Sequence, residues 1–195
     1  MPDRGTQILR AAARLIARRG VRGLRVEEVA AEAGVSTALI YYHFKNRSGL
    51  LRHTLEFINK RAVRYTDAAL DTTADPRTQL AEMLLLELQD TPEVRENSAA
   101  WGELRASAVF DADLGAQVAV ATRDWADDVA HLVRRAQEAG LAAPDVAPDA
   151  AAERLTALTE ALSERWLNGI APLERAQELL RGAIDRELGP LERSV

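Results

Sequence analysis

Residues 26–51 read VEEVAAEAGVSTALIYYHFKNRSGLL and contain the clearest structural pattern of the chain. Apolar residues recur at helical spacing on both sides of Gly34, and glycine suits a sharp turn because it tolerates a positive φ. Ser36 is a favourable N-cap. The pattern therefore predicts a short helix over residues 26–33, a tight turn, and a second short helix capped by Ser36 and ending near His43. This arrangement is a helix-turn-helix motif.

In such a motif the second helix projects its N-terminal residues into the major groove of DNA. We expect Ile40, Tyr41 and Phe44 to face inward. The side chains left for DNA are those of Ser36, Thr37, Ala38, Leu39, Tyr42 and His43. The threonine can hydrogen-bond a base edge or a phosphate, the alanine and leucine can contact a thymine methyl group, and the tyrosine and histidine can reach phosphates.

Two cations follow this second helix. Arg47 stands at the predicted N-terminus of the next helix, where a guanidinium and the free N–H groups of the helix end both favour a phosphate. Lys45 is a further candidate for the same kind of contact. These contacts would position the protein on DNA, whereas contacts to bases would specify the site.

The charge of the chain is unevenly distributed. The 195 residues carry a net charge of -5, but residues 1–53 carry +6 and the remainder carries -11. A basic N-terminal quarter on an acidic body suggests that only the first part meets a polyanion. On charge alone, an arginine-rich surface that is merely solvated explains the asymmetry equally well.

The rest of the chain predicts an all-α protein, because it is rich in good helix formers and has no long apolar–polar alternation. We expect an N-terminal three-helix DNA-binding domain over residues 1–48 and a larger helical domain over residues 49–195. Proline positions and apolar spacing predict helices over about residues 6–19, 46–70, 76–90, 92–109 and 112–139, then one closed by Gly169 and a last one between Pro172 and Gly189.

Two sets of apolar residues in the larger domain have a structural and a functional interpretation. The first set is Met83, Trp101, Phe110 and Trp125, which are either ordinary core or the lining of a pocket for a small-molecule effector. The second set is Leu155, Leu158, Leu162, Trp166, Leu179 and Ile184, which are either intramolecular core or the interface of a homodimeric four-helix bundle. We favour the dimer, because two-fold symmetry doubles the base contacts on a palindrome.

Several kinds of chemistry are excluded or unsupported. The chain has no Cys, which excludes disulfides, a thiolate nucleophile and Cys-based metal sites, and its three His are too scattered to hold a metal. The acidic pairs at 111/113 and 127/128 are poor evidence for catalysis, and neither a glycine-rich phosphate loop nor a Ser/His/Asp set is present. We therefore expect no enzyme and no cofactor. A helical enzyme and a protein-interaction module are the alternatives.

The residue pattern also bears on location. No apolar run approaches 18 residues, and the N-terminus lacks the apolar region of a signal peptide. We therefore expect a cytoplasmic protein with no membrane partner.

The N-terminal region resembles the TetR family of bacterial transcriptional regulators over roughly residues 8–55. The matching residues are Gly20, Val26, Val29, Ala30, the run Ala33-Gly34-Val35-Ser36, the run Ile40-Tyr41-Tyr42-His43-Phe44, Lys45-Asn46-Arg47 and Leu50-Leu51. The segments around Trp101 and over residues 155–169 resemble the subgroup related to the choline-responsive BetI repressor. The resemblance implies a ligand-responsive repressor that binds a palindromic double-stranded DNA operator as a homodimer and is released by a small-molecule effector, whose identity the sequence leaves open.

The sequence departs from the family pattern at three positions. Arg25 stands where the family often has a capping Thr, so capping worth ~1 kcal/mol is expected to be missing. Glu27 and Glu28 compensate in part through the helix dipole, and Arg25 can replace a hydroxyl–phosphate contact by an ionic one. Arg47 stands where Lys is commoner, and Leu39 where Thr is frequent, which leaves the base preference open.

Overall fold

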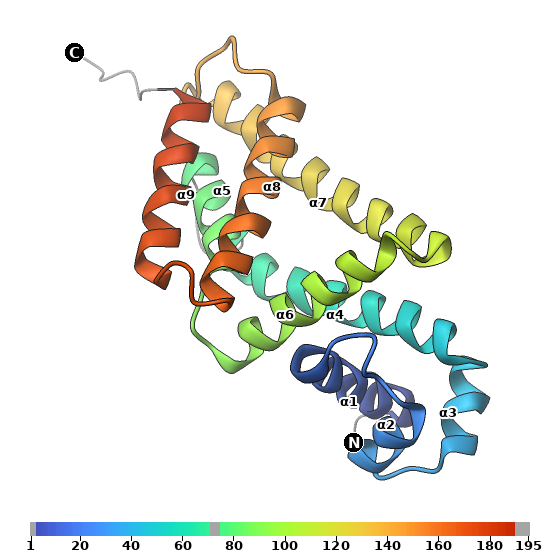
Figure 1. The fold of residues 1–195 in the computed structure, drawn as a ribbon. Helices are drawn as coiled ribbons and strands as arrows, with labels where there is room; N and C mark the ends of the chain where they lie inside the picture. Colours follow the sequence, from blue (N-terminus) through green and yellow to red (C-terminus); the bar gives the residue numbers. More distant parts are fainter. Residues whose placement is uncertain (1–2, 71–74, 190–195) are drawn as a thin grey trace. The chain divides into compact units, whose positions relative to one another are not determined.

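A computed structural model describes residues 3–70 and 75–189, and within these ranges the chain forms nine helices and no strand (Figure 1). The helices are α1 (Arg4–Arg19), α2 (Val26–Ala33), α3 (Thr37–Phe44), α4 (Arg47–Leu70), α5 (Pro76–Leu85), α6 (Pro92–Ala108), α7 (Ala112–Glu138), α8 (Pro148–Leu167) and α9 (Leu173–Leu188). The predicted all-α class is confirmed, and both helices of the predicted helix-turn-helix lie within one residue of their expected ends.

The helix predicted from Pro76 to about residue 90 is too long, because α5 ends at Leu85. Residues 86–88 continue as a turn, with hydrogen bonds from Glu87 N to Leu84 O at 3.3 Å and from Leu88 N to Leu85 O at 3.0 Å. The Leu88 carbonyl accepts from Gln177 Nε2 of α9 at 2.7 Å. In a continued helix this carbonyl would face residue 92, a proline without an N–H, so the Gln177 side chain satisfies an acceptor that a continued helix would leave unpaired.

The contacts divide the chain into two compact units. One contains residues up to 62 together with residues 95–121, and the other contains residues 63–94 and residues from 122 onward. The division differs from the predicted boundary after residue 48, because the first half of α4 and much of α6 pack with the N-terminal helices. The fully buried side chains of the first unit include Ile8, Ile16, Ile40, Leu50, Ile58, Leu104 and Leu114.

A glycine and a carboxylate shape the end of α1 in the first unit. Gly20 has φ 74° and ψ 168°, a backbone conformation that is essentially restricted to glycine. A Cβ at this position would lie 2.6 Å from Glu103 Oε2 of α6. The same oxygen accepts a hydrogen bond from the Val21 N–H at 3.2 Å. Glycine is therefore favoured here by its backbone conformation, and the Glu103 side chain would have to shift to admit a larger residue.

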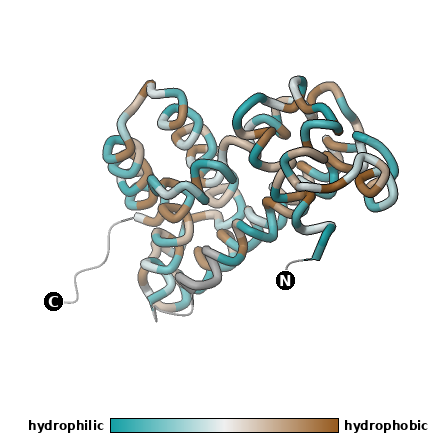
Figure 2. The backbone as a smooth tube through the Cα atoms, turned by 90° about the horizontal axis from the view of Figure 1, so that it is seen from below, coloured by the Kyte–Doolittle hydropathy of each residue, from teal (hydrophilic) through white to brown (hydrophobic). Residues whose placement is uncertain are grey.

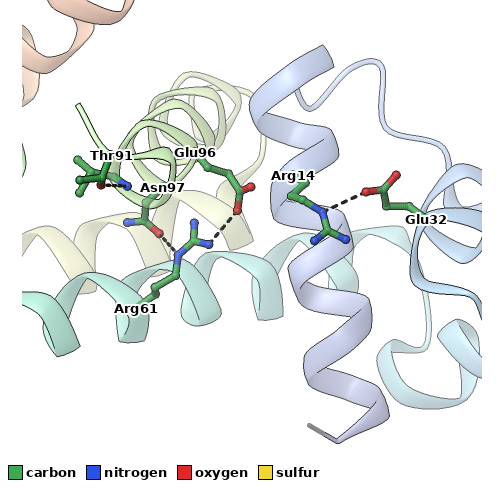
Figure 3. Close-up of polar contacts among 7 residues, drawn as sticks. Arg14, Glu32, Arg61, Thr91, Glu96 and Asn97 are labelled. Atoms are coloured by element: carbon green, nitrogen blue, oxygen red, sulfur yellow. Dashed lines mark hydrogen bonds and ion pairs between the residues drawn. The ribbon is translucent and has the colours of Figure 1, made fainter. Parts of the chain in front are cut away.

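A buried arginine joins α4 to α6 in the first unit (Figure 3). The Arg61 side chain donates from Nε to Asn97 Oδ1 and from Nη1 to Glu96 Oε1, both at 2.8 Å. Arg61 is only 8% exposed, so loss of either acceptor would leave a buried charge without full compensation. Figure 3 also shows the ion pair between Arg14 of α1 and Glu32 of α2, at 3.0 Å.

The second unit is built around α8 and α9, whose contact is the most extensive between two helices in the described part of the chain. Its core includes Leu80, Leu84, Leu155, Leu162 and Leu180. Arg77 of α5 donates to the carbonyl oxygens of Leu141 and Gly189, both at 2.9 Å, and so satisfies one acceptor just after α7 and one just after α9.

An ion pair also joins α8 to α9. Arg154 contacts Glu187 through two hydrogen bonds of 2.7 and 2.6 Å. The hydrogen bond from Arg154 holds the pKa of the Glu187 carboxyl below its usual range.

Hydrophilic and hydrophobic residues alternate along the helices in Figure 2, as expected when each helix buries one face. Among the residues that the structure describes, no helix is both long and apolar enough to cross a lipid bilayer.

Candidate nucleic-acid interface

The turn between α2 and α3 is closed by backbone hydrogen bonds. Gly34 adopts the left-handed conformation with φ 65° and ψ 38°, and its N–H donates to Ala31 O at 3.2 Å. The Val35 N–H donates to Ala30 O at 2.9 Å. Ser36 then caps α3, because its Oγ accepts from the Leu39 N–H at 3.2 Å. The sequence-based interpretation of Gly34 and Ser36 is therefore confirmed.

Helix α3 has one buried and one exposed side. Ile40 and Phe44 are buried in the core of the first unit. Tyr42 is 82% exposed, Ala38 and His43 are also exposed, and Thr37 and Leu39 are half-buried. The side chains predicted to meet DNA are thus accessible, although their contacts with DNA stay a prediction.

The expected inward position of Tyr41 is wrong, because this side chain is 46% exposed. Ile40 and Phe44 are four residues apart and share one side of the helix, whereas Tyr41 is rotated by about 100° from Ile40. Only the side of α3 that carries Ile40 and Phe44 packs against the core, and Tyr41 points away from that side. Tyr41 therefore joins the accessible surface of α3.

Aromatic rings orient the end of α3. The Tyr42 and His43 ring centroids lie 5.4 Å apart in an edge-to-face arrangement. Phe44 has the same arrangement with His53 of α4, also at 5.4 Å. His53 Nδ1 lies 2.7 Å from the Gly49 carbonyl oxygen and donates to it, which holds the imidazole in place. Such pairs favour defined ring positions beyond the burial of their area.

The junction between α3 and α4 is tight in a way that the sequence reading missed. Lys45 has φ 65°, and the Asn46 N–H donates to Phe44 O at 2.8 Å across it. Asn46 Oδ1 accepts from the Gly49 N–H at 2.7 Å and caps α4. A Cβ on Gly49 would lie 2.1 Å from the Phe44 carbonyl oxygen, so only glycine fits. The Asn-x-x-Gly spacing was the available signal.

The two flanking arginines behave differently. Arg25 is exposed at the start of α2 and makes no side-chain cap, as the sequence predicted. Arg47 is also exposed, but its guanidinium donates to two backbone carbonyls, from Nε to Leu24 O at 3.3 Å and from Nη2 to Val21 O. Lys45 is exposed. Arg25 and Lys45 therefore remain candidate phosphate ligands. The donors of Arg47, in contrast, hydrogen-bond the backbone of residues 21 and 24.

The residues predicted to line an effector pocket lie in different units. Met83 and Trp125 pack in the core of the second unit, and Trp101 packs against the core of the first. Phe110 is 79% exposed at the α6–α7 turn, with the Arg22 guanidinium 5.8 Å from its ring centroid. Phe110 thus forms a surface cation–π contact and is not enclosed within its unit, and its role in an effector pocket stays a prediction.

The predicted dimer interface also needs correction. Leu155, Leu162, Trp166 and Ile184 are buried in the core of their own unit, because the two sides of the α8–α9 pair that carry them pack inward. They cannot meet a partner helix as well. Leu158 is half-buried and Leu179 is 36% exposed, and only these two remain available.

No group of three or more His, Asp or Glu side chains that could hold a metal ion occurs within residues 3–70 and 75–189.

This architecture, an N-terminal helix-turn-helix on a larger helical body, defines a class of DNA-binding regulators. The family model described as bacterial regulatory proteins, tetR family, matches residues 8–54, and the model for the C-terminal domain of BetI-type transcriptional repressors matches residues 76–189. The chain belongs to the TetR family of transcriptional regulators, with a BetI-type C-terminal domain.

Individual proteins agree with this assignment. The HTH-type transcriptional regulator BetI of Brucella anthropi is 30% identical over 100 residues, which cover 51% of this chain and 52% of that protein. The chain thus matches about half the length of such curated relatives. A crystal structure from Rhodococcus sp. described as a TetR-family regulator has a TM-score of 0.89 and 45% identity, covering 97% of this chain and all of that one.

A transcriptional regulator from Saccharomonospora viridis, crystallised in complex with choline, has a TM-score of 0.85 and 29% identity, covering 97% of this chain and 98% of that one.

Substitutions of Ser36 separate the stability of α3 from its contact with DNA. Ser36→Ala removes the N-cap and is expected to lower the free energy of unfolding by about 1 kcal/mol. Ser36→Asp retains a capping oxygen and the favourable helix dipole, so it is expected to keep wild-type stability while its negative charge weakens DNA binding. Urea unfolding and fluorescence anisotropy on labelled DNA measure the two effects. Wild-type DNA affinity in Ser36→Asp would show that the start of α3 does not face phosphates.

Proposed function

We propose that the chain is a ligand-responsive repressor that binds a palindromic operator as a homodimer and leaves it when a small-molecule effector binds. The observation that carries the proposal is the division of α3, with Ile40 and Phe44 anchored in the core and Tyr42 and His43 exposed beside them. A helix held in this way can enter a major groove without losing its packing. The similarity to BetI-type repressors supports the repressor role.

The proposed homodimer is supported by the small size of the surface that α3 can present to DNA. One α3 presents only a few side chains, so two copies related by two-fold symmetry are needed for a long specific site. The surface proposed for the partner is the solvent side of α8 and α9. Its apolar and small residues are Ala157, Leu158, Ala161, Leu179, Gly182 and Ala183, which are exposed or half-buried. Small side chains allow a second pair of helices to approach closely.

The effector is proposed to bind the helical body and to favour a conformation in which the two DNA-binding units of the dimer have the wrong spacing. Half-sites on one face of DNA lie about 34–36 Å apart, so a change in spacing weakens binding. An effector can do this only if it binds the two conformations with different affinities. Choline is the first probe to test, because it is bound by the related regulator from S. viridis.

Selection of bound fragments from random DNA tests operator binding directly. We expect an inverted repeat, since a two-fold symmetric dimer reads the same half-site twice. Tyr42→Ala should weaken binding to all sequences, whereas Thr37→Ala should relax the preference at one position of each half-site by about 1–3 kcal/mol. Recovered fragments without any shared sequence would contradict specific binding, and unchanged binding by both variants would remove α3 as the reading element.

Charge placed on α9 tests the dimer. Leu179→Glu is expected to raise the dimer dissociation constant by about tenfold or more, because a carboxylate would lose its hydration in an apolar interface. Sedimentation equilibrium measures the constant. Ile170→Glu is the matched control, since Ile170 is an exposed apolar residue in the turn outside both helices. A wild-type chain that stays monomeric at every concentration, or equal dimerisation of both variants, would refute the proposed interface.

Titration of choline into the protein–DNA complex tests effector control. We expect the operator affinity to fall by about 5- to 150-fold at saturation, the usual range of coupling between two sites. Trp125→Ala should abolish the response to choline without changing operator affinity in its absence, because an indole face attracts a quaternary ammonium group. Trp125→Phe, which keeps an aromatic face, is the control. Operator affinity that choline leaves unchanged would exclude choline as the effector.

A further inference from the structure

The backbone of the connection between α1 and α2, residues 20–25, is hydrogen-bonded by side chains from two other helices. Val21 and Leu24 are buried in the core of the first unit, which anchors the apolar side of this segment. Within the segment the Leu24 N–H donates to Val21 O at 3.2 Å. The Val21 N–H donates to Glu103 of α6, and the carbonyl oxygens of Val21 and Leu24 accept from Arg47 of α4.

The partner from α4 is Arg47. Its Nε donates to Leu24 O at 3.3 Å and its Nη2 donates to Val21 O. Two donors of one planar guanidinium therefore hydrogen-bond two carbonyl oxygens whose residues are three positions apart in the sequence. Arg47 is the first residue of α4 and follows the Phe44–Asn46 turn that ends α3. These two hydrogen bonds of Arg47 thus tie the segment before α2 to the segment after α3.

The partner from α6 is Glu103, whose Oε2 accepts from the Val21 N–H at 3.2 Å. The Val21 residue consequently has its N–H bonded to α6 and its C=O bonded to α4. The same carboxylate oxygen lies where a Cβ of residue 20 would stand, so Glu103 is close to the backbone of both Gly20 and Val21.

We propose that Arg47 serves DNA binding as a positioning residue, which sets the angle of the helix-turn-helix by tying residues 21 and 24 to the start of α4, and that Glu103 completes the same tie from α6. Arg47 is then not chiefly a phosphate ligand, although it stands beside the proposed DNA-binding surface. The proposal rests on the operator binding proposed above.

The two roles predict different behaviour for lysine at this position. A lysine ammonium is a point charge on a flexible stem and can replace an arginine at a single phosphate. It cannot reproduce two parallel donors aimed at two separate carbonyl oxygens. Arg47→Lys therefore keeps the charge near DNA and removes the tie.

Operator affinity measured by fluorescence anisotropy at several salt concentrations, well below the unfolding temperature, distinguishes the roles. We expect Arg47→Lys and Arg47→Ala each to weaken binding by about tenfold, with the slope of log K against log[salt] unchanged from wild type. Glu103→Ala should weaken binding in the same way, and Glu103→Gln, which keeps an acceptor oxygen, should restore it. Arg18→Lys, at an exposed position on α1, is the control and should bind like wild type.

Wild-type affinity in Arg47→Lys would overturn the proposal, and so would a slope reduced by about one unit in Arg47→Ala, which is the signature of a lost phosphate contact. Amide hydrogen exchange gives a second measurement that needs no DNA. Arg47→Lys and Glu103→Ala are expected to accelerate exchange at Val21 and Leu24, and unchanged exchange at both amides would also overturn the tie. If the wild-type chain bound no DNA, operator binding would fail, while the exchange measurement would still test the tie.

Discussion

Burial of Ile40 and Phe44 is the constraint on which the DNA-binding surface depends. Helix α3 has only eight residues, and an isolated helix of that length is marginal in water. Each of the two apolar side chains gains about 1.5–3 kcal/mol from leaving water, which holds the helix against α1, α2 and α4. Because these anchors are four residues apart, the opposite side of α3 stays accessible. The same packing that stabilises the helix therefore presents Tyr42 and His43.

Close contacts of the backbone at the α3–α4 junction restrict the direction in which α3 can lie relative to α4. Gly49 admits the Phe44 carbonyl at a distance that no Cβ would allow, and Lys45 reverses the chain with a positive φ. At the end of α1, the Glu103 carboxylate lies where a Cβ of residue 20 would stand. Arg47 and Glu103 then hold the peptide groups of residues 21 and 24 between α4 and α6. We infer that these hydrogen bonds act together with apolar burial to orient α3.

The body of the protein shows how one helix pair can serve two tasks. The inward sides of α8 and α9 carry large apolar side chains such as Leu155 and Ile184, which form the core of the second unit. Their outward sides carry Ala157, Ala161 and Leu179, which suit a second pair of helices. In the sequence, the large apolar residues of these two helices suggested a dimer interface. In the structure most of them belong to the core, and the proposed partner surface consists mainly of small residues. Periodicity identifies an apolar face, but it does not say which neighbour covers that face.

The all-α class, the limits of the helix-turn-helix, the cap at Ser36 and the turn at Gly34 were predictable from the sequence alone, because they depend on residues close together in the chain. The exposure of Tyr41 follows from its angle on α3 once the core is known to hold Ile40 and Phe44. Packing was needed to show that Phe110 lies beside Arg22 on the surface and that Arg47 faces the carbonyls of Val21 and Leu24. These two outcomes depend on groups distant in sequence, and local propensity contains no information about such groups.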